Sequence, residues 1–240
     1  MSSEKPLKLP GTLRLMAVLL VCLASVAAAA KPKPDDDSLL NLVLSSLALD
    51  GPILIGTAIF LRASGKTWRN TFGFSNPPVG RAILLGLCAA LLFLPVGMVL
   101  QEISIRILTW LNVSTEAQVA VEEFNKSVFW VNRAYLVFLA IVLAPFAEEI
   151  MFRGILYAVI RKSGFPRLAL WISAFCFAVI HGNAPIFLPL LVLGLVLAWL
   201  YERTGNLLAS ITAHSVFNAI NIVFIFKDQI DEFLRRHSHF

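Results

Sequence analysis

Two adjacent glutamates, Glu148 and Glu149, lie in a stretch of sequence that is otherwise apolar. The run from residue 134 to residue 160 reads AYLVFLAIVLAPFAEEIMFRGILYAVI, and Arg153 is its only other charged residue. A carboxylate in the core of a bilayer costs at least ~2.5–3.5 kcal/mol, so two of them are expected only where a protein interior requires them. The pair predicts an enzyme or an ion-handling protein rather than a structural membrane module.

The spacing of these charges predicts different tasks for the two glutamates. Glu149 and Arg153 are four residues apart, the spacing at which side chains meet on a helix, so an ion pair would neutralise both. Glu148 is then left without a partner on its own helix. A carboxylate that must take and return a proton suits a general base.

Three more polar residues occur in the apolar C-terminal half of the chain. His181 ends the segment FAVIH, and His214 and Asn218 are four residues apart in a later apolar segment. Each also has a purely structural explanation. His181 could lie at the membrane interface, and His214 and Asn218 could form hydrogen bonds between packed helices. Together with Glu148 they predict one internal cavity and the hydrolysis of a peptide bond without a covalent intermediate. Glu148 would deprotonate a water molecule, and Asn218 could stabilise the oxyanion or hold the scissile carbonyl.

The two histidines leave two possibilities open. His181 and His214 could hold a divalent metal such as zinc, or they could position the water and stabilise the oxyanion. Signatures of other hydrolases are missing from the sequence, which contains neither a Gly-x-Ser-x-Gly nor a His-Glu-x-x-His motif. A serine nucleophile and an ordinary zincin site are therefore disfavoured.

The composition is that of a membrane protein. The 240 residues are 58% hydrophobic and only 15% charged, and the mean hydropathy is +0.79, whereas soluble domains carry roughly 25% charged residues. We expect an all-α fold, a polytopic transmembrane bundle of about seven or eight spans around an intramembrane polar cavity.

The sequence Asp50-Gly51-Pro52 should interrupt the second span, and Pro145 should kink a later helix or free a backbone carbonyl. Beyond the first segment, the predicted spans are 39–62, 82–101, 134–160, 168–182, 185–201 and 206–226.

The expected organisation has four parts. Residues 1–30 resemble either a signal peptide or a first transmembrane helix, residues 31–129 form the N-terminal helices and loops, residues 130–226 form the catalytic core, and residues 227–240 are a polar tail. The net charge of +5 comes from basic residues spread over short loops, which indicates membrane orientation and no nucleic acid. We expect a multi-pass protein of the plasma (inner) membrane whose partners are the lipid bilayer and a membrane-associated peptide or protein.

Three motifs on successive predicted helices resemble a known family. They are EEIMFR from Glu148 to Arg153, FAVIH from Phe177 to His181, and HSVFN from His214 to Asn218. In this order they resemble the CAAX protease and bacteriocin-processing (CPBP, or Abi) family of intramembrane proteases. The resemblance covers roughly residues 130–225.

The resemblance implies a helical protease with a cavity in the membrane. It implies that Glu148 activates water, that His181, His214 and Asn218 complete the site, and that Glu149, Arg153 and Phe177 support it. The leading hypothesis is therefore a glutamate-dependent endopeptidase with or without a metal. The alternatives are a non-catalytic scaffold or bacteriocin-immunity-type protein that binds a peptide in the same cavity, and a proton-coupled transporter.

Overall fold

The chain folds into helices that are long and apolar enough to cross a membrane. The structure is a computed structural model that describes residues 39–74, 78–113 and 130–237, with side chains up to residue 227. Within these ranges there is no β-strand, and five helical stretches have the length and composition of a membrane span. This is the architecture of an integral membrane protein and confirms the predicted fold class. The predicted count of seven or eight spans is not confirmed, and the proposed first segment lies outside the described residues.

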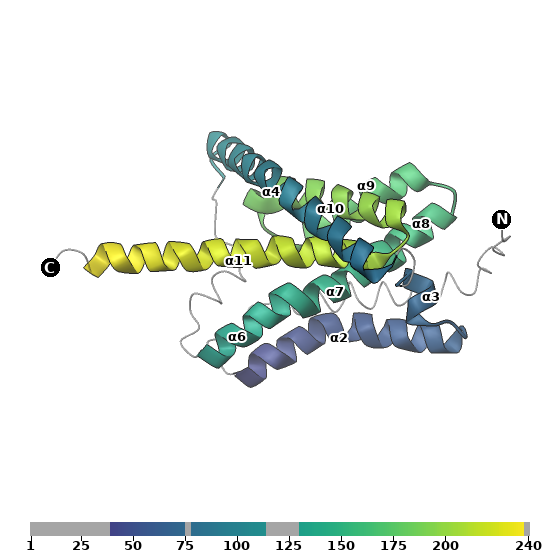
Figure 1. The fold of residues 1–240 in the computed structure, drawn as a ribbon. Helices are drawn as coiled ribbons and strands as arrows, with labels where there is room; N and C mark the ends of the chain where they lie inside the picture. The colour runs from purple at the N-terminus through teal and green to yellow at the C-terminus, as the bar shows by residue number, and fades with distance from the viewer. Residues whose placement is uncertain (1–38, 75–77, 114–129, 238–240) are drawn as a thin grey trace.

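From α6 to α11 the helices follow one another with short connections (Figure 1). Five stretches could span a membrane, namely α2, α4, the broken helix from α6 to α8, α10 and the first part of α11, whereas α9 is shorter. Helix α11 continues beyond its apolar part into the predicted polar tail. The elements are α2 (Leu39–Ala63), α3 (Trp68–Phe72), α4 (Val79–Trp110), α6 (Trp130–Phe138), η1 (Leu139–Leu143), α7 (Ala144–Glu149), η2 (Ile150–Tyr157), α8 (Ala158–Lys162), α9 (Pro166–Ile180), α10 (Ala184–Thr204) and α11 (Leu207–His237).

Helix α2 is continuous, which corrects the predicted interruption at Asp50-Gly51-Pro52. Pro52 lies inside the helix. It removes one backbone donor, and the rest of the turn still forms. Exposed leucines and isoleucines cover most of the helix surface, and such apolar side chains suit lipid contact.

The helix that carries the two glutamates is built partly of wider π-type turns. The segments η1 and η2 flank the short α-helical segment α7. At the first of them the backbone N–H of Ala144 donates to the carbonyl of Leu139, five residues earlier. In this register the next donor, to Ala140, would come from residue 145, which is a proline without an N–H. Such π segments occur frequently at functional sites.

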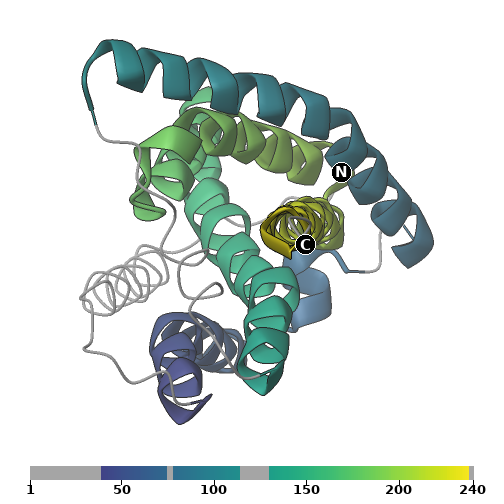
Figure 2. The same cartoon turned by 90° about the vertical axis from the view of Figure 1, so that its left-hand side faces the viewer.

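The first part of α11 packs among the other helices, and its C-terminal part extends beyond them (Figure 1). Figure 2 looks along this helix and shows α4 and the α6–α8 stretch on different sides of it. Two of the close approaches that require glycine lie between long helices. A Cβ at Gly86 in α4 would lie 2.8 Å from the Cβ of Thr212 and would collide with the carbonyl of Ala209 in α11. A Cβ at Gly194 in α10 would lie 2.9 Å from the Cα of Ala174 in α9. Glycine therefore lets these helix pairs approach closely.

Candidate active site

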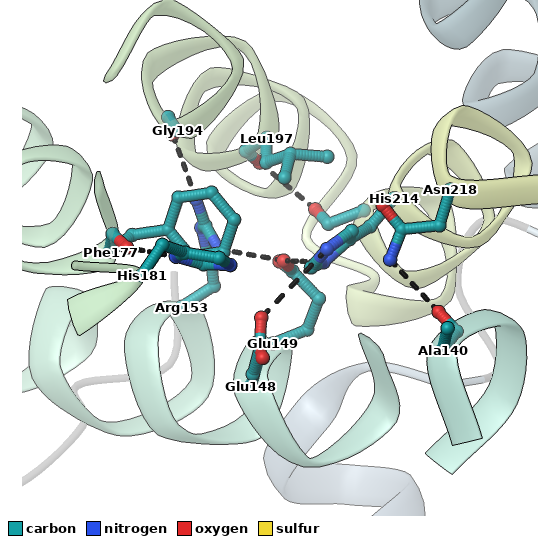
Figure 3. A network of polar contacts seen from close by, with 11 residues as sticks. Ala140, Glu148, Glu149, Arg153, Phe177, His181, Gly194, Leu197, His214 and Asn218 are labelled. Carbon is teal, nitrogen blue, oxygen red and sulfur yellow. Dashed lines mark hydrogen bonds and ion pairs between the residues drawn. The ribbon is translucent and has the colours of Figure 1, made fainter. Parts of the chain in front are cut away.

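The imidazole of His214 lies between the two glutamates. Its Nδ1 is 3.0 Å from Oε1 of Glu149, and its Nε2 is 3.8 Å from Oε2 of Glu148 (Figure 3). The shorter distance is a hydrogen bond in which the imidazole Nδ1–H donates to the carboxylate. The longer one is too long for a direct hydrogen bond. Helix α11 thus brings one histidine to both members of the Glu-Glu pair.

Oε1 of Glu149 is held by two structural contacts, whereas its buried Oε2 has no hydrogen-bond partner among the described residues. Its Oε1 also accepts a 2.6 Å hydrogen bond from Arg153, and both side chains are 0% exposed. The other end of the guanidinium donates to the backbone carbonyl of Gly194 in α10 at 3.1 Å. The ion pair expected from the i,i+4 spacing is therefore present, and it connects η2 to α10. A pair buried in this way neutralises two charges that would otherwise be costly in the interior.

Glu148 differs from Glu149 in its environment. Its side chain keeps 20% of its exposure, and its Oε2 has no hydrogen-bond partner among the described residues. Among the described residues, no arginine or lysine side chain lies as close to Glu148 as Arg153 lies to Glu149. Oε2 of Glu149 is unpaired as well, but Glu149 is 0% exposed and bound to Arg153. Glu148 is therefore the better placed of the two carboxylates to bind a water molecule and exchange a proton with it.

The ring of Phe177 holds the other groups together. The guanidinium of Arg153 lies 4.5 Å from the centre of this ring, a distance at which cation and ring attract each other. The rings of His181 and His214 contact it at centroid distances of 4.9 Å and 5.3 Å. Phe177 is itself 0% exposed. One aromatic side chain from α9 therefore sets the positions of both histidines and of the arginine.

His181 lies directly after the end of α9. Its Nδ1 is 2.7 Å from the carbonyl oxygen of Phe177, one turn earlier. A carbonyl can only accept, so Nδ1 carries the hydrogen and Nε2 keeps its lone pair in the neutral ring. The ring therefore presents one acceptor nitrogen.

Asn218 is held by the broken helix. Its Nδ2 donates to the carbonyl of Ala140 at 2.9 Å, which is the carbonyl that Pro145 leaves without a backbone donor. The sequence placed Asn218 on the same face as His214, and in the structure both point toward the α6–η2 stretch (Figure 3). In this arrangement the amide joins α11 to η1.

The two histidines do not form a metal site with the acids around them. Among the residues that the structure describes, no group of three or more His, Cys, Asp or Glu side chains is arranged to hold a metal ion. Both nitrogens of His214 face carboxylates, and Nδ1 of His181 faces a carbonyl. This donor set does not match the three or four convergent ligands of a protein zinc site.

Sequence reasoning missed one acidic residue close to this centre. Asp50 in α2 is 7% exposed and interacts electrostatically with Glu148, from a part of the chain that none of the three motifs covers. The sequence does mark Asp50 as unusual, because it is the only charged residue between positions 39 and 61. Sequence reasoning treated it only as part of a predicted helix break.

The comparisons with known proteins agree with these motifs. Residues 130–220 match the model of the Rce1-like family, described as type II CAAX prenyl endopeptidase Rce1-like. The chain is 31% identical over 121 residues to the uncharacterized protein YpbD of Bacillus subtilis (strain 168), covering 48% of this chain and 57% of that protein. It is also 31% identical over 78 residues to the UPF0177 protein YxdF of Lactococcus lactis subsp. lactis (strain IL1403), covering 32% of this chain and 42% of that protein. No solved structure matches the chain significantly.

The helical fold and the polar centre define the class as polytopic membrane proteins with an intramembrane polar site. The match of residues 130–220 to the Rce1-like model confirms the resemblance stated from the motifs. The chain spans about half the length of the curated relatives it matches.

Proposed function

We propose that this protein is an intramembrane endopeptidase that hydrolyses a peptide bond of a membrane-associated protein or peptide, with water activated by Glu148. The observation that carries the proposal is the contrast between the two glutamates. Glu149 is 0% exposed and paired with Arg153, whereas the Glu148 side chain is 20% exposed, has no such cation and faces His214 at 3.8 Å. The Rce1-like match over residues 130–220 supports a protease rather than a transporter.

The proposed reaction needs one water and one base. Glu148 takes a proton from the water, and the resulting hydroxide attacks the carbonyl carbon of the scissile bond. The C–O bond forms, the C–N bond then breaks, and the proton held by Glu148 passes to the departing amine. Carboxylic acid and amine are released, and Glu148 returns to its carboxylate form.

The histidines serve this reaction in different ways. The lone pair on Nε2 of His181 can accept a hydrogen bond from the attacking water. His214 donates to Glu149 through Nδ1, and its Nε2 lies on the side of Glu148, where it can exchange a proton with the reacting groups. Glu149 acts through His214 by fixing the orientation of the ring, and Arg153 and Phe177 hold Glu149 and the rings in place.

Asn218 is proposed to position the site rather than to contact the substrate in this conformation. Its amide is bound to Ala140 and therefore fixes α11, and with it His214, against the helix that carries Glu148. Stabilising an oxyanion would require the amide to leave Ala140 first. The proposed reaction includes no step through a metal, because the described donors around Glu148 are not arranged to hold one.

The experiment that tests the function compares peptide termini in membrane and secreted fractions of cells with wild-type protein and with Glu148→Gln at matched abundance. General-base catalysis contributes about 10²–10⁴-fold to a rate, so the termini made by this protein should disappear in the variant. Glu102→Gln is the matched control, because Glu102 is 58% exposed and pairs with Arg106 in α4. The same termini in wild type and Glu148→Gln would overturn the proposal.

A binding protein without catalysis would behave differently in this experiment. Its phenotype would survive Glu148→Gln and would be lost when bulky side chains fill the cavity. Localisation in the plasma membrane also remains a proposal, which fractionation of the same cells tests.

A further inference from the structure

The buried face of α2 is polar. The buried residues of this helix are Ser46, Asp50, Ile53, Thr57 and Leu61. They follow one another at intervals of three or four residues and so lie on one face. Three of the five carry polar side chains, in a helix whose opposite surface is apolar. Packing between apolar helices does not require this pattern.

Polar groups of α6 face the outer part of this surface. The hydroxyl groups of Ser46 and Tyr135 are hydrogen-bonded to each other. Asn132, three residues before Tyr135 and hence on the same side of α6, is 3% exposed. Asp50 follows Ser46 by one helical turn. Helices α2 and α6 both begin at the same end of the molecule (Figure 1), so this polar surface starts there and continues inward.

The inner end of this surface is Glu148. Helix α2, which carries Asp50, packs against α7 and η2 as well as α6, and α7 carries Glu148. The charge of Asp50 therefore acts on Glu148. Oε2 of Glu148 and Oγ1 of Thr57 are buried without a hydrogen-bond partner within the described residues. Asp50 makes no hydrogen bond or ion pair to any side chain or backbone group in that part of the chain.

The described part of the protein supplies no cation that would satisfy these acids. Besides Asp50, the charged or titratable groups around Glu148 are Glu149 of α7, Arg153 of η2 and His214 of α11. Arg153 is bound to Glu149 and Gly194, and His214 is bound to Glu149. Buried polar atoms are normally paired with protein or with ordered water. The Ser46 hydroxyl already bonds to the Val43 carbonyl and to Tyr135. Water is the remaining partner for Oε2 of Glu148, Oγ1 of Thr57 and the carboxylate of Asp50.

We propose that water reaches Glu148 along this polar seam, formed by Ser46, Asp50 and Thr57 of α2 and by Asn132 and Tyr135 of α6. The inference rests on the proposed function, since a hydrolase consumes one water molecule in each turnover and its site lies among apolar helices. Asp50 is then a positioning residue: it keeps the seam hydrated next to Glu148 and has no contact with the substrate. The α2 side of the seam lies outside the segment that matches the family, and the α6 side lies within it.

Thiol labelling tests water in the seam without any need for activity. In a background with Cys22, Cys88 and Cys176 replaced by alanine, Ser46→Cys is compared with Leu47→Cys in the membrane-embedded protein. The two positions are neighbours, but Ser46 is 3% exposed and Leu47 is 53% exposed on the apolar surface. A small cationic methanethiosulfonate reacts with thiols in contact with water, so the cysteine at 46 should react at least tenfold faster. Equal or slower labelling at 46 would show a dry seam and overturn the proposal.

A second measurement tests the connection to Glu148. Glu148→Cys is labelled alone, together with Asp50→Leu, and together with Asp50→Asn. Leucine should close the seam and slow labelling at least tenfold, whereas asparagine keeps it polar and should leave labelling within about threefold. Unchanged labelling with Asp50→Leu would mean that water arrives by another route, which also overturns the proposal. Persisting termini in Glu148→Gln cells, with labelling as expected, would overturn only the proposed protease activity.

Discussion

The amide of Asn218 donates a 2.9 Å hydrogen bond to the carbonyl of Ala140, 78 residues earlier in the chain. This carbonyl needs an outside donor because residue 145, which would donate to it in the local π register, is a proline. A side chain from α11 therefore completes the hydrogen bonding of the helix that carries the two glutamates. The contact holds His214, one turn before Asn218, against that helix.

Asn218→Ala should lower the free energy of unfolding by ~1–3 kcal/mol, because it leaves the Ala140 carbonyl unpaired away from water. The loss should be smaller in a Pro145→Ala background, where residue 145 regains its N–H. Thermal unfolding of the two single variants and the double variant in detergent measures this coupling. Asn221→Ala is the control, because its amide binds Phe217 within α11 and should show no coupling to residue 145. Additive effects of Asn218→Ala and Pro145→Ala would mean that the Asn218 amide does not replace the backbone donor that Pro145 lacks.

The buried pair Glu149–Arg153 should behave as one unit. Glu149→Gln or Arg153→Met alone leaves the partner charge buried and should cost about 3–5 kcal/mol. The double variant removes both charges and should be less destabilised than the sum of the two. A double-mutant cycle on thermal unfolding in detergent measures the difference.

The exposed pair Glu102–Arg106 provides the comparison, since its side chains are 58% and 77% exposed and have the same i,i+4 spacing. The corresponding substitutions there should change stability by less than ~1 kcal/mol. If Arg153→Met is as mild as Arg106→Met, the Arg153 guanidinium is not a structural element of the site.

Gly86→Ala should destabilise the protein by ~1–3 kcal/mol and reduce cleavage. The added methyl group would meet Ala209 and Thr212 of α11 and push apart two closely packed helices. Gly80→Ala in the same helix is the matched control, because a Cβ there would have no neighbouring atom of the described residues within 4 Å, and alanine favours helix at such a position. Unfolding midpoints and formation of the wild-type termini are measured for both. Equal behaviour of the two variants would show that α4 and α11 are not in close contact.

Removal of divalent metals should leave the proposed endopeptidase activity unchanged. The basis is the orientation of the histidines: Nδ1 of His181 faces the Phe177 carbonyl, and both nitrogens of His214 face carboxylates. Purified protein dialysed against a strong chelator is assayed for release of the termini, with and without added zinc. Activity that disappears with the chelator and returns with zinc would require His181 and His214 to turn toward a shared ligand position.

Several features of the molecule follow from local sequence. Long apolar runs must form helices in a membrane, because a spanning helix satisfies its own backbone hydrogen bonds. The pairing of Glu149 with Arg153 follows from helical spacing alone. The order of the three polar motifs was enough to indicate the family, and it also indicated one shared site. The predicted break at Pro52 was wrong, because a proline removes only one donor and the rest of α2 remains paired.

The relations between helices required the tertiary structure. The sequence contains Glu148, Glu149 and His214, but only the packing of α11 against α7 makes His214 face both glutamates and leaves Glu148 accessible. Asp50 lies in a segment without any of the motifs, and only the packing of α2 on α7 places it beside Glu148. Such contacts depend on crossing angles and on close approach at residues such as Gly86 and Gly194. Crossing angles and close approach are set by the side-chain shapes of both helices together. The periodicity of a sequence describes only one helix at a time.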